Sequence, residues 1–183
     1  QFDEGILMTD FFVPEKNEQE LTKTALAMNI KDFVFLYGLK EYEEKYNKDH
    51  NKINEGIKKK GNIKDDNFKR GVLLKGDYKI NDLIKASKIS DFVVVESNDN
   101  LRQVLERMRN IYVYGCENLS RPDFIHHRNS GLNHILANIA KKNNTKFLFN
   151  FEDFVKKDKI KKSLLFGRLK QNLVLYRKYD LDF

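Results

Sequence analysis

Short apolar runs of branched and aromatic residues recur along this chain, separated by stretches with helical spacing. The clearest run is FVVV at 92–95, which contains no polar residue. A strand that is apolar at consecutive positions must be buried on both faces, because successive side chains point to opposite sides of a sheet. Strands of this kind occur in parallel sheets covered by helices, so the pattern favours an α/β fold.

Six runs are predicted to be strands, and helical patterns connect them. The predicted strands lie at 10–14, 32–38, 70–76, 91–97, 111–115 and 145–151. The predicted helices lie at 18–29, 41–60, 80–87, 100–110, 132–139 and 163–179, with the lysine-rich segment 155–162 as a loop or helix start. This alternation fits an open doubly wound sheet or a (β/α) barrel. Neither G-x-G-x-x-G nor G-x-x-x-x-G-K-[ST] occurs, which counts modestly against a dinucleotide-binding fold.

Length and composition are typical of a soluble domain with a charged surface. The chain has 183 residues, of which 40% are hydrophobic and 33% charged, and no apolar run approaches the ~20 residues of a membrane span. Cys116 is the single cysteine, so an intrachain disulfide framework is excluded. Residues 1–7 lack a secretory-signal pattern. We therefore expect a cytoplasmic protein with one barrel-like domain at 8–183, no membrane partner, and an unplaced N-terminal extension at 1–7.

The positive charge of the protein is concentrated in its last third. Residues 121–183 contain 14 Lys and Arg against 6 Asp and Glu, whereas residues 1–120 contain 20 against 21. One-sided cationic charge attracts polyanions such as RNA. A lysine-rich composition without any polyanion partner explains the same counts, so charge alone does not separate the two interpretations.

Three of the four histidines lie close together in the segment HHRNSGLNH. They are His126, His127 and His134, and Asp123 is the carboxylate nearest to them in the sequence. A zinc site needs three or four ligands with workable spacing, and the side chains of an adjacent pair diverge in any regular element. Acid–base catalysis needs a partner carboxylate and an oriented substrate. Both functions are weakly supported by this spacing.

A structural role for the segment is favoured instead. Asn129 or Ser130 is predicted to cap a helix that begins near Gly131, because its side chain can accept bonds from the free N–H groups of the first turn. His134 is then expected beside the apolar face of that helix, where it anchors the preceding loop. Arg128 is left to reach solvent or phosphate.

The same segment, with two that follow it, resembles a known family. HHRNSGLNHILANIAKKNN, then FLFNF, then LLFGRLKQNLVLYRKY are similar to protein component 3 of archaeal ribonuclease P and to the corresponding subunit of the eukaryotic enzyme. The start, MTDFFVP, resembles the first strand of the family through Asp10 and Pro14. The match is specific over 126–179 and looser over 8–115. The matching residues in the specific part are Arg128, Ser130, Gly131, His134, Asn144, Phe149, Gly167, Arg168, Asn172, Arg177 and Lys178.

The resemblance implies a fold and a role. The fold is an α/β, TIM-like (β/α) barrel related to metal-dependent phosphoesterase barrels, and it is expected to be incomplete at the C-terminus because the family continues further. The role is that of a noncatalytic subunit of ribonuclease P, the endoribonuclease that removes the 5′ leader of precursor tRNA. The implied partners are the ribonuclease P RNA, other protein subunits, especially component 2, and precursor tRNA indirectly. Magnesium is used by the RNA.

This chain is expected to bind no cofactor or metal itself and to supply no catalytic residue. Phosphoesterase barrels carry His-x-His on the first strand, and DFFVP contains no histidine. Aromatic residues lie mostly within strands and are expected to belong to the core. The alternatives that stay open are a metal-dependent phosphoesterase-like enzyme and a protein-binding module with a basic face.

The candidate RNA contacts are basic side chains of the last third. Arg can bond two phosphate oxygens, whereas Lys acts as a point charge. Backbone and shape recognition is expected, because double-stranded RNA offers little access to its base edges. The candidates are Arg128, Lys156, Lys157, Lys159, Lys161, Lys162 and Arg168. Ser130, Gly131 and His134 are the predicted structural motif.

Overall fold

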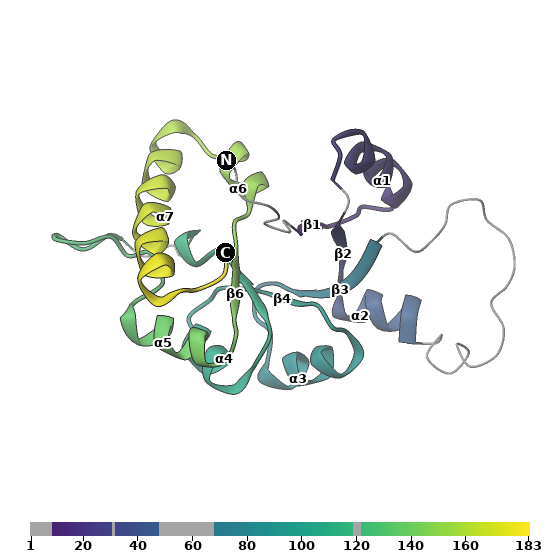
Figure 1. The fold of residues 1–183 in the computed structure, drawn as a ribbon, viewed down its shortest axis with the longest axis horizontal. Coiled ribbons are helices and arrows are strands. Elements are labelled where there is room, and N and C mark those ends of the chain that lie inside the picture. Colours follow the sequence, from purple (N-terminus) through teal and green to yellow (C-terminus); the bar gives the residue numbers. More distant parts are fainter. Residues whose placement is uncertain (1–8, 31, 48–67, 119–121) are drawn as a thin grey trace, which may run out of the picture. The chain divides into compact units, whose positions relative to one another are not determined.

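A computed structural model describes residues 9–30, 32–47, 68–118 and 122–183 (Figure 1). The predicted extension 1–7 and most of the predicted helix 41–60 lie outside the described residues. Within them, the strands follow the chain order β1-β2-β3-β4-β5-β6, and the neighbours for which a register is defined pair in parallel. The strands are β1 (Asp10–Phe12), β2 (Phe33–Gly38), β3 (Phe68–Leu74), β4 (Val93–Glu96), β5 (Tyr112–Tyr114) and β6 (Lys146–Leu148).

Helices connect the strands. They are α1 (Glu18–Ala27), α2 (Leu39–Tyr42), α3 (Ile80–Ile89), α4 (Leu101–Arg107), α5 (His134–Lys142), α6 (Phe151–Lys156) and α7 (Lys159–Tyr179), with a π-helical turn η1 (Glu43–Asn47) and a 3₁₀ turn η3 (Cys116–Asn118). The strand order is sequential, without the reversal that defines a doubly wound sheet. It is the order of a (β/α) barrel. The α/β prediction is therefore confirmed, and the TIM-like barrel that is incomplete at its C-terminus stays a prediction.

The chain divides into two units, each described by itself. One consists of Gln1–Leu73 with Lys85–Val93, and the other of Leu74–Ile84 with Val94–Phe183. The prediction of one domain at 8–183 stays a prediction. None of the helices in the described ranges has the length and apolar character that crossing a bilayer requires.

The first unit is built around β2, which is buried at five consecutive positions, Phe33 to Tyr37. Burial on both faces is the property that the apolar runs predict. Leu36 lies opposite Gly71 of β3 in the parallel register. A Cβ on Gly71 would lie 2.8 Å from both Cβ and the carbonyl oxygen of Phe92, and 2.9 Å from Cδ2 of Leu36. The sheet therefore has no room for a side chain at residue 71.

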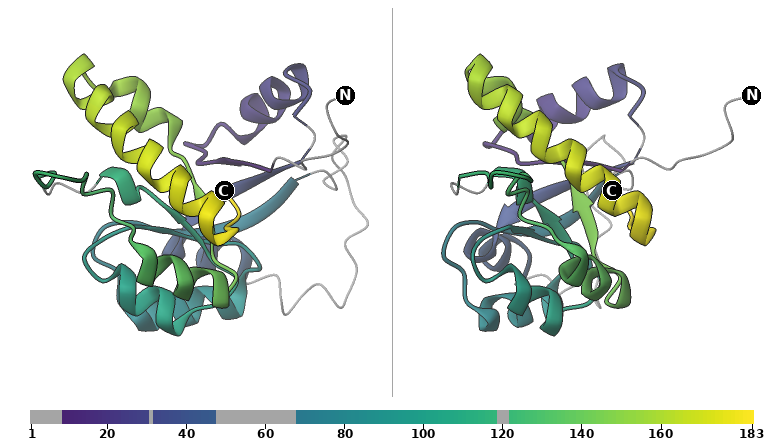
Figure 2. Two further views of the ribbon diagram at one scale, coloured as in Figure 1. Left: turned by 60° about the vertical axis from the view of Figure 1, so that its left-hand side comes forward. Right: turned by 90° about the vertical axis from the view of Figure 1, so that its left-hand side faces the viewer.

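The second unit contains β5, β6 and the long helix α7, which lies beside α5 and η3 (Figure 2). Its core includes Val95, Leu105, Val113 and Phe147. The buried face of α7 combines apolar Leu165 and Tyr176 with two polar side chains, those of Arg168 and Asn172. Buried polar groups require hydrogen-bond partners, and the partners of these two define the candidate site described below.

The predicted end of β6, at 151, and the predicted start of α7, at 163, are wrong. The strand ends at Leu148 rather than at 151, because the side chain of Asn150 accepts hydrogen bonds from the N–H groups of Glu152 and Asp153 and so begins α6. The segment 155–162, predicted to be a loop or a helix start, contains the end of α6 and the start of α7. Asp158 caps α7 by accepting a hydrogen bond from the N–H group of Lys161, and the helix begins at Lys159.

The last residues return to the edge of β6. The N–H group of Lys146 bonds to Ile111, beside β5, whereas the N–H group of Phe147 donates to the carbonyl oxygen of Asp182 at 2.9 Å. The ring of Tyr176 stacks on Phe147, with ring centroids 4.8 Å apart, and on Phe183, with centroids 5.3 Å apart. This is the position in which a (β/α) barrel places its next parallel strand.

We expect Gly71→Ala to destabilise the protein by about 1–3 kcal/mol, because the added methyl group overpacks the contacts to Phe92 and Leu36. Gly38→Ala is the matched control, since a Cβ there meets no atom within 4 Å. Urea unfolding of the two variants measures the difference. Equal midpoints would contradict the close packing at residue 71.

Candidate functional site

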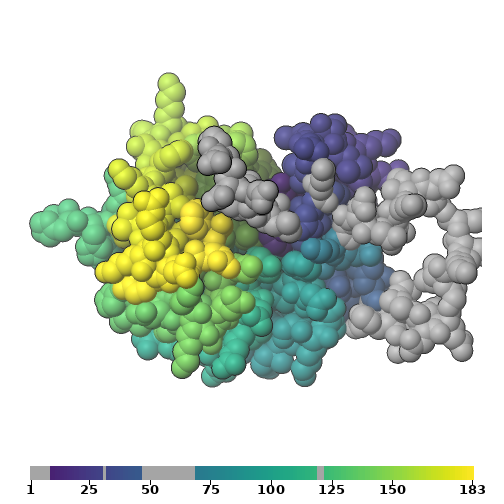
Figure 3. Space-filling view, viewed as in Figure 1, coloured from purple at the N-terminus to yellow at the C-terminus, as the bar shows by residue number. Residues whose placement is uncertain are grey.

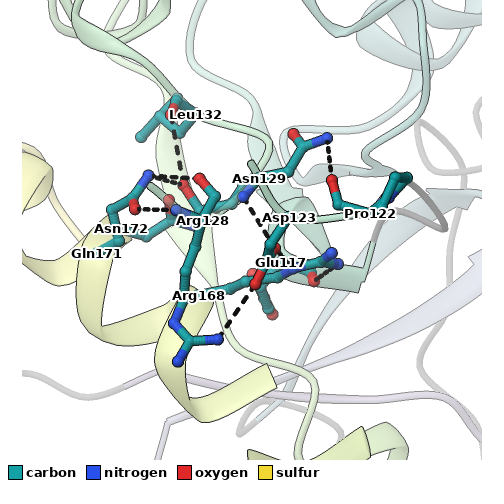
Figure 4. A network of polar contacts seen from close by, with 10 residues as sticks. Glu117, Pro122, Asp123, Arg128, Asn129, Leu132, Arg168, Gln171 and Asn172 are labelled. Carbon is teal, nitrogen blue, oxygen red and sulfur yellow. Dashed lines mark hydrogen bonds and ion pairs between the residues drawn. The ribbon is translucent and has the colours of Figure 1, made fainter. Parts of the chain in front are cut away.

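A buried ion pair fixes the loop that precedes α5 to helix α7 (Figure 4). Arg168 is only 3% exposed. Its Nε donates to Oδ1 of Asp123 at 2.8 Å, and its Nη1 donates to the carbonyl oxygen of Glu117 at 3.2 Å. A buried guanidinium is costly unless its N–H groups are bonded. Arg168 therefore ties the loop and the turn η3 to the same point on the helix.

The next turn of α7 binds the backbone of the loop. The side-chain amide of Gln171 accepts a bond from the N–H group of Arg128 at 3.1 Å and donates to the carbonyl oxygen of Arg128 at 2.9 Å. Its Nε2 also donates to Oγ of Ser130 at 3.0 Å, and Nδ2 of Asn172 donates to the carbonyl oxygen of Ser130 at 3.0 Å. These contacts hold residues 128–130 along the helix (Figure 4).

The side chain of Arg128 lies across Gly167 of α7. A Cβ on Gly167 would lie 2.3 Å from Nε of Arg128, a separation that requires the arginine to move. Glycine within a helix costs about 1 kcal/mol relative to alanine, so this contact gives a physical reason for the glycine. Nη1 of Arg128 donates to Oδ2 of Asp123 at 3.1 Å, and the arginine side chain remains 47% exposed.

Asp123 is the acceptor on which both arginines converge. Partial desolvation raises its pKa, but the bonds from the N–H group of Asn129 and from the two guanidinium groups outweigh this effect. The net result is that the pKa of Asp123 lies below its ordinary value. Its carboxylate is therefore ionised at neutral pH and neutralises part of the positive charge of Arg168 and Arg128.

A shallow groove of about 410 Å³ lies beside Arg128, along the first turns of α7. Its described lining consists of Arg128, Lys159, Ile160, Ser163 and Leu164. The polar members are a guanidinium, an ammonium and a hydroxyl group, all of which can donate hydrogen bonds, and this described lining includes no carboxylate. Such a donor set matches the acceptor oxygens of a phosphate group.

The structure brings together two of the seven candidate RNA contacts, Arg128 and Lys159. The prediction that Arg168 contacts RNA is corrected by the structure. Its side chain is buried and forms the internal ion pair with Asp123. The other four are lysines of α6, of the α6–α7 junction and of the first turn of α7. Lys156 pairs with Glu152, Lys161 pairs with Asp158 at 3.3 Å, Lys162 lies over the ring of Phe154, and Lys157 follows α6.

Exposed ion pairs such as those of Lys156 and Lys161 contribute about 0–1 kcal/mol. Both lysines can therefore exchange a carboxylate for a phosphate at little cost. Their role as RNA contacts stays a prediction.

The predicted cap of α5 is wrong. Asn133, rather than Asn129 or Ser130, caps the helix, and its side chain accepts bonds from the N–H groups of Ile135 and Leu136. Ser130 is instead buried under α7, and Gly131 has a φ of +77°, which favours glycine.

His134 begins α5 with its side chain exposed. The prediction that His134 lies beside the apolar face of α5 is therefore wrong. The structure places the contacts to the preceding loop on Gln171 and Asn172.

A second polar group lies at the carboxyl ends of β5 and β6, where (β/α) proteins commonly place functional residues. Oδ2 of Asp153 accepts bonds from the amides of Asn118 and Asn150, at 3.0 and 2.9 Å. Burial raises the pKa of the Glu117 carboxyl, and the charge of Asp153 adds to the shift. Burial also raises the pKa of the Cys116 thiol to about 12. In the described ranges, no group of three or more His, Cys, Asp or Glu side chains is arranged to hold a metal ion.

The prediction from sequence missed the helix side of the site. Five residues share one face of α7, because each lies three or four positions from another member of the set: Ile160, Ser163, Leu164, Gly167 and Gln171. Gly167 was recognised only as part of a resemblance. A glycine and polar side chains are interspersed with the apolar residues of this face, and that pattern is the signal that could have revealed a contact surface.

Fold and site together define a class: an α/β protein with sequentially ordered parallel strands and a groove rich in hydrogen-bond donors. No protein-family model matches the sequence, and no curated protein matches it. Among solved structures, the chain is similar to a chain in the cryo-EM structure of archaeal ribonuclease P with mature tRNA. The two are 20% identical with a TM-score of 0.62, and the match covers 95% of this chain and 71% of the other. At this identity the likeness establishes the fold.

We expect Arg168→Met to destabilise the protein by about 3–5 kcal/mol, because it removes one partner of a buried ion pair. Arg177→Met, on the exposed side of the same helix, should change stability by no more than about 0.5 kcal/mol. Urea unfolding of both variants makes the comparison. If the Arg168 variant unfolded at the same urea concentration as the wild type, the structural role of Arg168 would be wrong.

We expect Glu117→Gln to raise the midpoint of thermal unfolding at pH 7. The raised pKa means that the folded protein holds this proton to higher pH than the unfolded chain does. The stability that the folded protein has with a neutral Glu117 carboxyl group is fully present below the ordinary glutamate pKa of about 4.3. It is lost as pH rises through the pKa of Glu117 in the folded protein. The gain should therefore shrink towards pH ~4. The same change at exposed Glu20 should leave the midpoint nearly unchanged. Equal effects of the two variants at pH 7 would refute the conclusion that the buried carboxylate of Glu117 destabilises the fold.

Proposed function

We propose that this chain is a protein subunit of ribonuclease P, which removes the 5′ leader of precursor tRNA. The observation that carries the proposal is the structural likeness over 95% of the chain to a chain from archaeal ribonuclease P. The sequence resemblance to component 3 also supports the proposal, and it is specific over residues 126–179. This range contains the residues that line the groove, and it contains Gly167, on which Arg128 lies.

The proposed role is to bind and stabilise the catalytic RNA, together with other protein subunits such as component 2. The RNA breaks the phosphodiester bond and uses magnesium, and precursor tRNA meets this chain only through the complex. Arg128 and Lys159 would contact backbone phosphates, with Ser163 as a further donor. Each such contact releases counterions, so affinity should fall steeply with salt concentration.

The groove supports backbone recognition rather than base readout. Its donors are a fork-shaped guanidinium, which suits two phosphate oxygens, and an ammonium at the start of α7. An ammonium on a flexible stem is a point charge, which suits any phosphate and selects no particular base edge. Affinity for RNA of many sequences is therefore part of the proposal.

Reconstitution tests the function. The RNA, the other protein subunits and this chain are combined, and cleavage of the 5′ leader is measured at low magnesium with and without the chain. Addition of the chain should raise the cleavage rate. No effect of omitting it at any magnesium concentration would refute the proposal, and stoichiometric divalent metal in the purified chain would favour the phosphoesterase alternative.

Two variants distinguish the contribution that the position of the Arg128 guanidinium makes to RNA binding from the contribution of its charge. Arg128→Ala removes the charge and should reduce the slope of log K against log salt concentration by about 1. Gly167→Ala keeps every charge and should stabilise helix α7 by up to about 1 kcal/mol, yet it displaces Arg128 and should also weaken binding. Lys23→Ala, an exposed charge on α1, is the control.

Salt-insensitive binding of RNA by the wild type between about 50 and 200 mM would instead favour the protein-binding alternative. Unchanged affinity in both the Arg128 and the Gly167 variant would remove the groove from the proposed interface.

A further inference from the structure

The loop that carries Arg128 begins with a tight hairpin of residues 123–128. The N–H group of Phe124 donates to the carbonyl oxygen of His127 at 2.9 Å, across the two-residue turn of Ile125 and His126. Residues paired in this way across a hairpin face the same side. Accordingly, the rings of Phe124 and His127 are stacked, with centroids 4.5 Å apart and planes 27° from parallel.

Two apolar side chains at the tip of this hairpin are exposed. Phe124 is 56% exposed and Ile125 is 95% exposed. Figures 1 and 3 show the loop before α5, residues 122–133, projecting past α7 at the edge of the view. Adjacent exposed apolar side chains, on a chain that is one-third charged, form a candidate contact site.

The base of the hairpin is held in place on α7. Asp123, at one end, binds Arg168 and the N–H group of Asn129. Arg128, at the other end, binds Asp123 through its guanidinium and Gln171 through its backbone. The stacked pair is therefore presented in a fixed place, and little ordering has to accompany binding.

We propose that the Phe124–His127 pair is a platform on which an unpaired base of an RNA partner stacks. The inference rests on the proposed function and names the RNA element that this part of the site takes. Stacking on an aromatic side chain accepts any base, because every base has a π-face, and it contributes about 1–3 kcal/mol per base.

The chemistry of the hairpin favours RNA over a protein pocket. Arg128 immediately follows His127, so an aromatic face and a half-exposed guanidinium occupy neighbouring positions. An unpaired nucleotide offers both a base and a phosphate, and single-stranded loops and bulges are the elements in which bases are free to stack on proteins. An apolar pocket of a protein would have to desolvate His126, His127 and Arg128 beside the tip.

A tryptophan reporter tests the proposal directly, because the chain contains no tryptophan. Phe124→Trp keeps an aromatic ring at the tip, and its emission is followed while a single-stranded oligoadenylate is added to the full chain. The emission should be quenched by this single strand, and much less by an RNA duplex of equal length. Phe183→Trp, an exposed aromatic position at the last residue, should not be quenched.

Affinity for the same oligoadenylate provides the second readout. Phe124→Ala should weaken binding about 5- to 150-fold, the equivalent of losing one stacked base, whereas Phe124→Tyr should bind like the wild type. The ring of Phe124 is not part of the bonds that fix the hairpin to α7, so the unfolding midpoint should be unchanged in both variants.

Each other outcome is informative. Wild-type binding with the expected salt dependence, but no quenching in Phe124→Trp and no loss in Phe124→Ala, would overturn this inference and leave the proposed function standing. A shift of the tryptophan emission of the Phe124→Trp variant on addition of the other protein subunits, without any response to RNA, would assign the tip to a protein pocket and overturn it too. A wild-type chain that neither binds RNA nor affects reconstituted cleavage would refute both.

Discussion

The contact between the buried guanidinium of Arg168 and the carboxylate of Asp123 holds the candidate site together. It joins residues that are 45 positions apart in the sequence. Because a guanidinium away from water requires partners, the loop before α5 cannot leave α7 without exposing or orphaning Arg168. Every other feature of the site follows from that attachment: Gln171 reaches the backbone of Arg128, and Arg128 lies over Gly167.

Two arginines with the same chemistry thereby take different roles. Arg168 uses its hydrogen bonds inside the protein, whereas Arg128 shares one end of its guanidinium with Asp123 and stays half exposed. A single carboxylate that is ionised at neutral pH organises both. This division explains how a cationic surface can be well ordered: the buried arginine sets the position of the exposed one, and the exposed one lines the groove with Lys159.

The strands were predictable from the sequence because burial on both faces leaves consecutive apolar residues, as in β2 and β4. Helix α6 was not, because the apolar residues Phe149 and Phe151 favour a strand that continues to 151 unless Asn150 is recognised as a cap. Arg168 was misplaced for a different reason. Its neighbours in the sequence do not show that Asp123 lies against that face of α7, and a lysine-rich surrounding makes any arginine look solvent-exposed. The exposed aromatic ring of Phe124 was hidden in the same way, since sequence pattern does not show a projecting hairpin.

Hydrogen–deuterium exchange of the chain, alone and bound to the ribonuclease P RNA, tests most directly whether the Arg168–Asp123 contact organises an RNA-binding surface. The amides of Arg128 and Asn129 donate to Gln171 and Asp123, so they should exchange slowly in the free chain. Bound RNA should slow exchange further in 122–131 and in the first turns of α7. Fast exchange of these two amides in the free chain, or an RNA footprint confined to other segments, would contradict the account.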